Sequence, residues 1–183
     1  MSNILLVSAT TLEHGKTEIK GVPIHIIGIG KVEASANLNK LLVEHTPSVV
    51  VNFGSCGNLK DHKVGDLLEV GTSYNDFYAG TLHTSLPFRL SPSNIKCLTT
   101  DTFYEKGETY HHSYLHRIKG CDIVDMELYS IVYTCKLRKI PVVAYKWVSD
   151  DGSPENWEKI ASIGFELFEK KFDSIIETYG TAN

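Results

Sequence analysis

Acidic residues stand within four positions of the ends of three apolar runs in this sequence, where they could act as acids and bases. They are Glu13 after residues 4–9, Asp125 and Glu127 after residues 123–124, and Asp150 after residues 142–148. Short apolar runs are typical of strands buried on both faces, and the carboxyl ends of parallel strands meet at one edge of a sheet, where ligands bind. Carboxylates that converge in a cleft repel one another, so the pKa of at least one should rise and produce a proton donor. One such group can act as general acid while another acts as base.

Each of these residues also has a purely structural interpretation. Glu13 by itself is more often a solvated surface residue, and Asp125 and Glu127 could place negative charge at a helix N-terminus. Ser149 and Asp150 could cap a helix. The segment Gly54-Ser55-Cys56-Gly57, which closely follows an apolar run, is typical of a tight turn. The residues alone therefore indicate an acidic site without fixing its chemistry.

Signals for a metal or an organic cofactor are weak. Gly28-Ile29-Gly30 lacks the third glycine of a dinucleotide-binding fingerprint. No HExxH pattern accompanies His111, His112 and His116, so a solvated helix face is favoured over a metal site. No two of the four cysteines form a C-x-x-C pair, which argues against zinc, and we expect reduced thiols in a cytoplasmic protein. We expect neither a cofactor nor a metal.

Short apolar runs typical of strands alternate along the chain with segments whose apolar residues follow helical spacing. Strands are predicted at 4–7, 22–29, 49–51, 66–70, 96–100, 123–124 and 141–148, and helices at 33–45, 105–117, 127–139 and 157–179. The last of these shares one apolar stripe and is predicted as a single long helix. Residues 74–94 show no clean period, so we expect a loop with at most one short strand. The alternation predicts an α/β fold: a three-layer domain with a mostly parallel or mixed twisted sheet flanked by helices.

The length and charge of the chain limit the classes of protein to which it can belong. The chain has 183 residues, 42% of them apolar and 22% charged, which suits one globular domain over residues 1–183. The net charge is −4 and only three arginines occur, so we expect no binding to nucleic acid. No apolar stretch approaches the roughly 20 residues that span a bilayer, and the N-terminus lacks the pattern of a signal peptide. A handler of small molecules is expected.

The order of several motifs resembles the nucleoside phosphorylase and nucleosidase superfamily. The motifs are Gly28-Ile29-Gly30-Lys31-Val32-Glu33-Ala34, Val50-Val51-Asn52-Phe53-Gly54-Ser55-Cys56-Gly57, Val64-Gly65-Asp66, Val124-Asp125-Met126-Glu127 and Val148-Ser149-Asp150. The match covers nearly the whole chain, and the set is specific although no single piece is. Within the superfamily the chain looks most like the 5'-methylthioadenosine/S-adenosylhomocysteine nucleosidases. This resemblance implies cleavage of the N-glycosidic bond of a purine nucleoside and release of the base.

The resemblance also implies a role for individual residues. Glu13 matches the glutamate that activates the attacking water, and Asp150 matches the aspartate that protonates the purine at N7. The other matches are substrate contacts. Glu127 matches the glutamate that holds the ribose hydroxyls, Met126 packs under the sugar, and Lys146 stands in place of an arginine on the sugar side. Ser55 lies near the water, Ser149 lies next to the acid, and Phe103 stacks on the base with Tyr104 beside it. By default, aromatics such as Phe103 and Tyr104 would be core residues. A homodimer is expected by resemblance alone.

Three hypotheses stay open at this point. Phosphorylases hold phosphate with arginine, and the N-terminal third has none, which favours water as the nucleophile and a nucleosidase. A phosphate-dependent purine nucleoside phosphorylase is the first alternative. The second is a non-catalytic nucleoside- or base-binding protein on the same scaffold, motivated by the short middle segment. Lys146 and Asp125, which stand where the nucleosidases have arginine and glutamate, leave room for a substrate other than methylthioadenosine.

Overall fold

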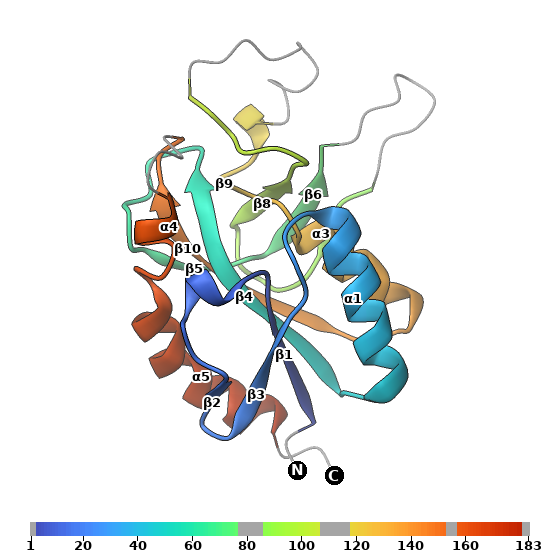
Figure 1. Cartoon of the computed structure of the whole chain (residues 1–183). Coiled ribbons are helices and arrows are strands. Elements are labelled where there is room, and N and C mark those ends of the chain that lie inside the picture. The colour runs from blue at the N-terminus through green and yellow to red at the C-terminus, as the bar shows by residue number, and fades with distance from the viewer. Residues whose placement is uncertain (1–2, 77–85, 107–117, 153–156, 181–183) are drawn as a thin grey trace.

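A twisted mixed sheet with helices on both faces forms the molecule (Figure 1). The computed structural model describes residues 3–76, 86–106, 118–152 and 157–180. The strands are β1 Ile4–Ser8, β2 Glu18–Ile19, β3 Val22–Ile26, β4 Val49–Asn58, β5 Leu67–Glu69, β6 Thr72–Asn75, β7 Phe88–Arg89, β8 Lys96–Thr99, β9 Ile123–Asp125 and β10 Val142–Asp150. The helices are η1 Thr11–Glu13 (a 3-10 turn), α1 Lys31–Glu44, α3 Leu128–Leu137, α4 Trp157–Ile160 and α5 Phe165–Tyr179. The predicted α/β fold is confirmed.

The strands follow the order β2-β3-β1-β4-β9-β8-β6-β7, and β10 lies beside β4 and pairs with β5. The pairs of β1 with β3 and β4, of β10 with β4, and of β8 with β6 and β9 are parallel. The pairs of β4 with β9 and of β5 with β10 are antiparallel, so the sheet is mixed. Parallel central strands bury both faces, which explains their continuous apolar runs.

Alternate side chains of the central strands enter two separate cores. Leu5 and Val7 of β1 pack with one face of α1 and α3, whereas Ile4 and Leu6 pack under α5. The period of two in a strand produces this division. Two cores and one sheet give three layers, with α1 and α3 on one face and α5 on the other (Figure 1).

The C-terminal segment is two helices, so the prediction of one long helix is wrong. Its apolar stripe is interrupted between α4 and α5 at residues 161–164. There the indole Nε1 of Trp147 donates to the carbonyl oxygen of Ala161 at 2.6 Å. A Cβ on Gly164 would lie 2.2 Å from Cβ of Trp147, so only glycine lets the chain pass this close to the sheet. Tertiary packing has overridden the helical period.

Other segments also differ from the sequence-based expectations. The glycine-rich segment 54–57 is not a tight turn but extended chain within β4, which is ten residues long. In the described part of residues 74–94, β7 is the one strand that lies wholly inside the segment, as expected, and the end of β6 overlaps its first two residues. The predicted helix 105–117 lies mostly outside the described residues, as do His111, His112 and His116. In the described ranges no helix is long and apolar enough to cross a membrane.

Candidate active site

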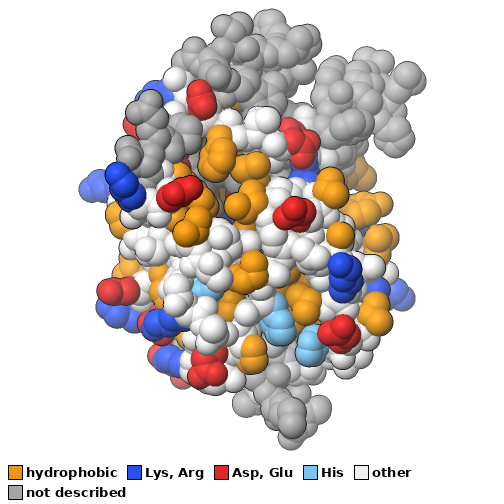
Figure 2. Space-filling model, in the orientation of Figure 1, with side chains coloured by type: hydrophobic (Ala, Val, Ile, Leu, Met, Phe, Trp, Pro, Cys, Tyr) orange, Lys and Arg blue, Asp and Glu red, His pale blue; other side chains and the backbone are white. Residues whose placement is uncertain are grey.

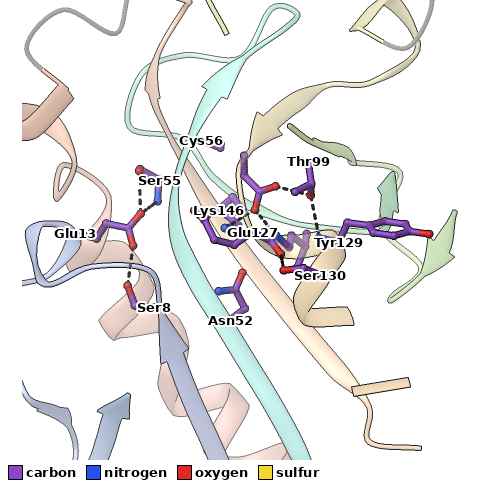
Figure 3. Close-up of polar contacts among 12 residues, drawn as sticks. Ser8, Glu13, Asn52, Ser55, Cys56, Thr99, Glu127, Tyr129, Ser130 and Lys146 are labelled. Carbon is purple, nitrogen blue, oxygen red and sulfur yellow. Dashed lines mark hydrogen bonds and ion pairs between the residues drawn. The ribbon is translucent and has the colours of Figure 1, made fainter. Parts of the chain in front are cut away.

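An opening along one edge of β4 creates the site. Strand β1 pairs with β4 only as far as Asn52, and β9 joins the strand at Gly57. On the other side of β4, β10 pairs continuously over this stretch. The backbone between Asn52 and Gly57 therefore faces a gap in the sheet, where its polar groups need other partners. Polar side chains gather on both sides of this stretch of β4 (Figure 3).

Glu13 fills the gap from the β1 side. It ends the 3-10 turn that follows β1, and only 4% of the residue is exposed, so the interpretation as a solvated surface residue is wrong. One carboxylate oxygen accepts from the backbone N–H of Ser55 at 2.7 Å and from its hydroxyl at 2.9 Å. The other accepts from the hydroxyl of Ser8 at 2.7 Å. Three donors hold the carboxylate in one orientation.

The approach of Glu13 to β4 depends on Gly54. A Cβ at position 54 would lie 2.7 and 2.9 Å from the two carboxylate oxygens and 3.0 Å from the carboxyl carbon of Glu13. A side chain at position 54 would displace the carboxyl group and break its hydrogen bonds with Ser55 and Ser8. Glycine is therefore needed here for close approach, and not for a turn.

Asp150 enters the site at the other end of the opening, at the end of β10. One of its oxygens, Oδ1, accepts from the backbone N–H of Gly152 at 2.9 Å. The other, Oδ2, lies 2.8 Å from the hydroxyl of Ser149, which also lies 3.2 Å from the carbonyl oxygen of Cys56. A hydroxyl has one proton, so Ser149 cannot donate fully to both acceptors. The Ser149 hydroxyl therefore links Asp150 to the carbonyl oxygen of Cys56 on β4.

A buried ion pair lies at the wall of the pocket, which Asp125 helps to line. The ammonium of Lys146 lies 2.8 Å from Oδ2 of Asp125, and the two side chains are 3% and 1% exposed. Asp125 also accepts from the hydroxyl of Thr99 at 2.7 Å and from the backbone N–H of Leu128 at 2.9 Å. Burial alone would lower the pKa of Lys146, but the carboxylates of Asp125 and Glu127 outweigh it and raise that pKa. The structural interpretation of Asp125 thus holds as well, since it caps the start of α3.

Glu127 lines the pocket beside this ion pair. The backbone N–H of Gly30 donates to its carboxylate at 2.8 Å, which joins the loop before α1 to the loop before α3. Burial and the nearby charge of Asp125 raise the pKa of Glu127 to about 7, whereas Lys146 and the Gly30 N–H act in the opposite direction. The raised pKa expected of converging carboxylates is therefore found at Glu127.

One pocket of about 560 Å³, partly open to solvent, joins these groups. It is lined by Ala9, Thr10, Glu13, Ile29, Ser55, Cys56, Gly57, Thr100, Thr102, Phe103, Tyr104, Val124, Asp125, Met126, Glu127, Ser149, Asp150 and Trp157. The structure thus brings together all the predicted site residues except Lys146, which is not among the lining residues in the described part of the chain. Phe103 is 46% exposed and so is not a core residue.

Lys146 is the one predicted contact that the geometry does not support. The sequence places it on β10, four residues before Asp150, and we expected its side chain on the sugar side of the substrate. Its ammonium instead turns to Asp125 and is 3% exposed. Two carboxylates in a dry environment hold a cation more strongly than a solvated pocket would, which explains this orientation.

Two residues of the site were missed by the sequence analysis. Ser8 was given no role, since it follows the predicted strand 4–7, and its signal was its position five residues before Glu13. Trp157 was assigned to the apolar stripe of the tail, yet it lines the pocket and its indole Nε1 donates to the hydroxyl of Ser55 at 3.1 Å. No periodic pattern could separate it from the core, because the helix break at residues 161–164 is a tertiary effect.

Comparison with known proteins decides the family. Residues 8–87 and 94–178 match the family model described as the Phosphorylase superfamily. The chain belongs to this superfamily. Among curated members, the 5'-methylthioadenosine/S-adenosylhomocysteine nucleosidase of Haemophilus influenzae (strain PittEE) is 28% identical over 88% of this chain and 80% of the relative. That of Staphylococcus epidermidis is 29% identical over 84% of this chain and 77% of the relative.

Solved structures of the superfamily share the fold. The 5'-methylthioadenosine/S-adenosylhomocysteine nucleosidase of Neisseria meningitidis, in complex with methylthio-immucillin-A, gives a TM-score of 0.79 at 16% identity and covers 96% of this chain and 98% of its own. Futalosine hydrolase of Helicobacter pylori gives 0.75 at 15% identity, with 93% and 97% covered. Identities this low establish the shared architecture and leave the substrate to be argued from the site.

Proposed function

We propose that this superfamily member hydrolyses the N-glycosidic bond of a purine nucleoside and releases the free base. The observation that carries the proposal is the placement of two carboxyl groups in one pocket, Glu13 against Gly54 and Asp150 beside Gly57. These glycines are three positions apart along β4, which corresponds to about 10 Å. A nucleoside between the two groups would have a base and an acid at opposite ends.

Asp150 is the proposed general acid. Loss of a purine leaves negative charge on the base, so a proton delivered to its ring nitrogen makes it a better leaving group. The Ser149 hydroxyl and the Gly152 N–H fix the orientation of its carboxyl group. Phe103 and Tyr104 line the pocket on the loop 100–106, where we propose that they cover the base.

Glu13 is the proposed base that orients and deprotonates the attacking water. Its three donors, two from Ser55 and one from Ser8, keep it aimed into the pocket. The bond that forms joins the water oxygen to the anomeric carbon, and the bond that breaks joins that carbon to the base nitrogen. The water proton goes to Glu13, and the proton of Asp150 goes to the base, so the products are a free sugar and a neutral base.

Glu127 and Met126 are proposed to hold the sugar. The ionised carboxylate of Glu127 can accept from two ribose hydroxyls, in charge-assisted hydrogen bonds that are stronger than those to a neutral carboxyl. A negative charge beside the sugar also favours the oxocarbenium-like transition state. Since curated relatives are named 5'-methylthioadenosine/S-adenosylhomocysteine nucleosidases, we propose an adenine nucleoside of this class as the substrate.

The charge of the pocket favours water over phosphate. Four carboxyl groups line it, and the lining residues in the described ranges include no arginine or lysine. A phosphorylase needs a cationic clamp for its phosphate dianion, and these lining residues supply none. The non-catalytic alternative is disfavoured by Glu13 and Asp150, because a binding protein needs neither a proton donor nor an activated water.

Two further parts of the proposal concern assembly and location. Large apolar side chains are exposed on α1 and α3: Val32 is 82%, Val43 71%, Tyr133 51% and Leu137 72% exposed. Apolar side chains lie along this flank in Figure 2. Surfaces of this kind mark protein contacts, and we propose that they support a homodimer. The four cysteines are all buried, which suits the reduced thiols of a cytoplasmic enzyme.

The test is release of base from a panel of purine nucleosides, with and without phosphate, followed by chromatography. The proposal predicts release of adenine from 5'-methylthioadenosine or S-adenosylhomocysteine without phosphate, together with free sugar. Release that requires phosphate and yields a sugar 1-phosphate would establish a phosphorylase instead. Binding of nucleosides without release over long incubation would establish the non-catalytic alternative.

A further inference from the structure

Trp157 is connected to Glu13 by a short chain of hydrogen bonds. The indole Nε1 of Trp157 donates to the hydroxyl oxygen of Ser55 at 3.1 Å, and that hydroxyl donates to Oε1 of Glu13 at 2.9 Å. The backbone N–H of Ser55 donates to the same carboxylate oxygen at 2.7 Å. The indole thus reaches the catalytic carboxylate through one intervening group.

The chemistry of these groups fixes the direction of the chain. An indole N–H can only donate, and a serine hydroxyl has one proton and two lone pairs. When Trp157 donates to Ser55, one lone pair of the hydroxyl is occupied, and its proton is left for Glu13. Without this donor the hydroxyl could rotate about its C–O bond and give its proton to a water or to the substrate. The indole therefore holds the Ser55 hydroxyl in the orientation that supports Glu13.

Packing brings Trp157 to this place. The break between α4 and α5, fixed by the contacts of Trp147 with Ala161 and Gly164, separates Trp157 from the core stripe of α5. Its ring stands edge-on to Phe103, with centroids 5.9 Å apart, and both residues line the pocket. Trp157 therefore has two separable features: a ring that contacts Phe103 and an N–H that contacts Ser55.

We infer that Trp157 is a positioning residue for Glu13, which acts through the hydroxyl of Ser55. The inference rests on the proposed function, in which Glu13 activates water. In it, the Trp157 N–H contacts none of the reacting atoms and acts only by orienting Ser55. Loss of the N–H alone should lower kcat, because Glu13 is held less well when it takes the proton of the attacking water. It should leave KM little changed, because the ring remains.

Trp157→Phe separates the two features, since phenylalanine keeps an aromatic ring and lacks the donor. We expect kcat for base release to fall about three- to tenfold, the effect of one hydrogen bond, with KM within about twofold of the wild type. In a Ser55→Ala background the same substitution should have no further effect on kcat. A merely structural role predicts equal losses in both backgrounds, and either that result or an unchanged kcat for Trp157→Phe would overturn the inference.

A second measurement is independent of turnover. The chain has two tryptophans, so a protein labelled with nitrogen-15 shows two indole N–H resonances by NMR. The Trp157 resonance should move in Ser55→Ala, whereas that of Trp147, which donates to Ala161, serves as the internal control and should stay. Equal behaviour of both resonances would contradict the hydrogen bond. Absence of base release from the wild type would overturn the proposed function, while the indole resonances would still decide this contact.

Discussion

Lys146 and Asp125 form an ion pair at 2.8 Å although their side chains are only 3% and 1% exposed. Removal of two charges from water costs several kcal/mol for each ion, and their attraction offsets this only when the remaining polar atoms are also bonded. Asp125 meets that condition through Thr99 and the backbone of Leu128. The pair therefore ties β10 to the start of α3, from which Glu127 faces the pocket.

Replacement of Lys146 by methionine should destabilise the fold by about 3–5 kcal/mol, since it leaves Asp125 buried and unpaired. The double variant Lys146→Met, Asp125→Asn should lose less than the sum of the two single changes, because no uncompensated charge remains. Urea denaturation measures both. Lys60→Met is the matched control, because it breaks an exposed pair with Asp122 and should change the urea midpoint little. A strictly additive double variant would contradict the account of this pair.

The stability of the protein should depend on pH through Glu127. Burial raises the pKa of Glu127 from 4.5 to about 7, so between these values the folded state binds more protons than the unfolded state. The free energy of unfolding should therefore fall as pH rises through this window and level off above it. Glu127→Gln does not titrate and should lack this part of the slope. Urea midpoints across the window compare the two proteins, and identical slopes would contradict a raised pKa.

The activity should also depend on the ionisation of Glu127, but it should rise with pH where the stability falls. If the ionised form of Glu127 holds the ribose, kcat/KM for base release should fall as pH drops below about 7. Because the charge of Lys146 lowers the pKa of Glu127, Lys146→Met should move this acid limb to higher pH. Initial rates at low substrate concentration across the pH range measure the shift. A limb that stays in place would show that Lys146 does not act on the protonation of Glu127.

Gly54→Ala should reduce base release at least about 100-fold, because a Cβ would lie 2.7 Å from the carboxylate of Glu13 and displace it. Gly120→Ala is the control, since no heavy atom lies within 4 Å of the Cβ it would add. Steady-state rates and thermal midpoints should be measured together. A Gly54→Ala protein that retains more than half of the wild-type rate would show that Glu13 need not occupy its observed position.

The sequence predicts the sheet and the acidic site because both depend on local patterns. Apolar runs mark the strands, and Glu13, Asp125 and Asp150 stand where those runs end. The break before α5 could not be predicted, because it depends on the contact between Gly164 and Trp147 across the fold. The ion pair of Lys146 with Asp125 was missed for a similar reason. The pattern of a β-strand predicts which face of the sheet a side chain lies on, but not its ion-pair partner.

Local sequence patterns could not predict the opening along the edge of β4 either. It arises because β1 ends its pairing at Asn52 and β9 starts at Gly57, and no sequence period records where two distant strands diverge. The consequence is functional, since the unpaired N–H of Ser55 becomes a donor to Glu13. The extended conformation of the glycine-rich segment follows from the same arrangement.

The general acid assignment is the central claim, and Asp150→Asn tests it most directly. Adenine release from 5'-methylthioadenosine should be measured for this variant and for Asp151→Asn, a matched control at the exposed neighbouring position. The account predicts a fall of about 10²- to 10⁴-fold for Asp150→Asn with an unchanged thermal midpoint, and a nearly normal rate for the control. An Asp150→Asn protein that releases adenine at a rate near the wild type would contradict the account.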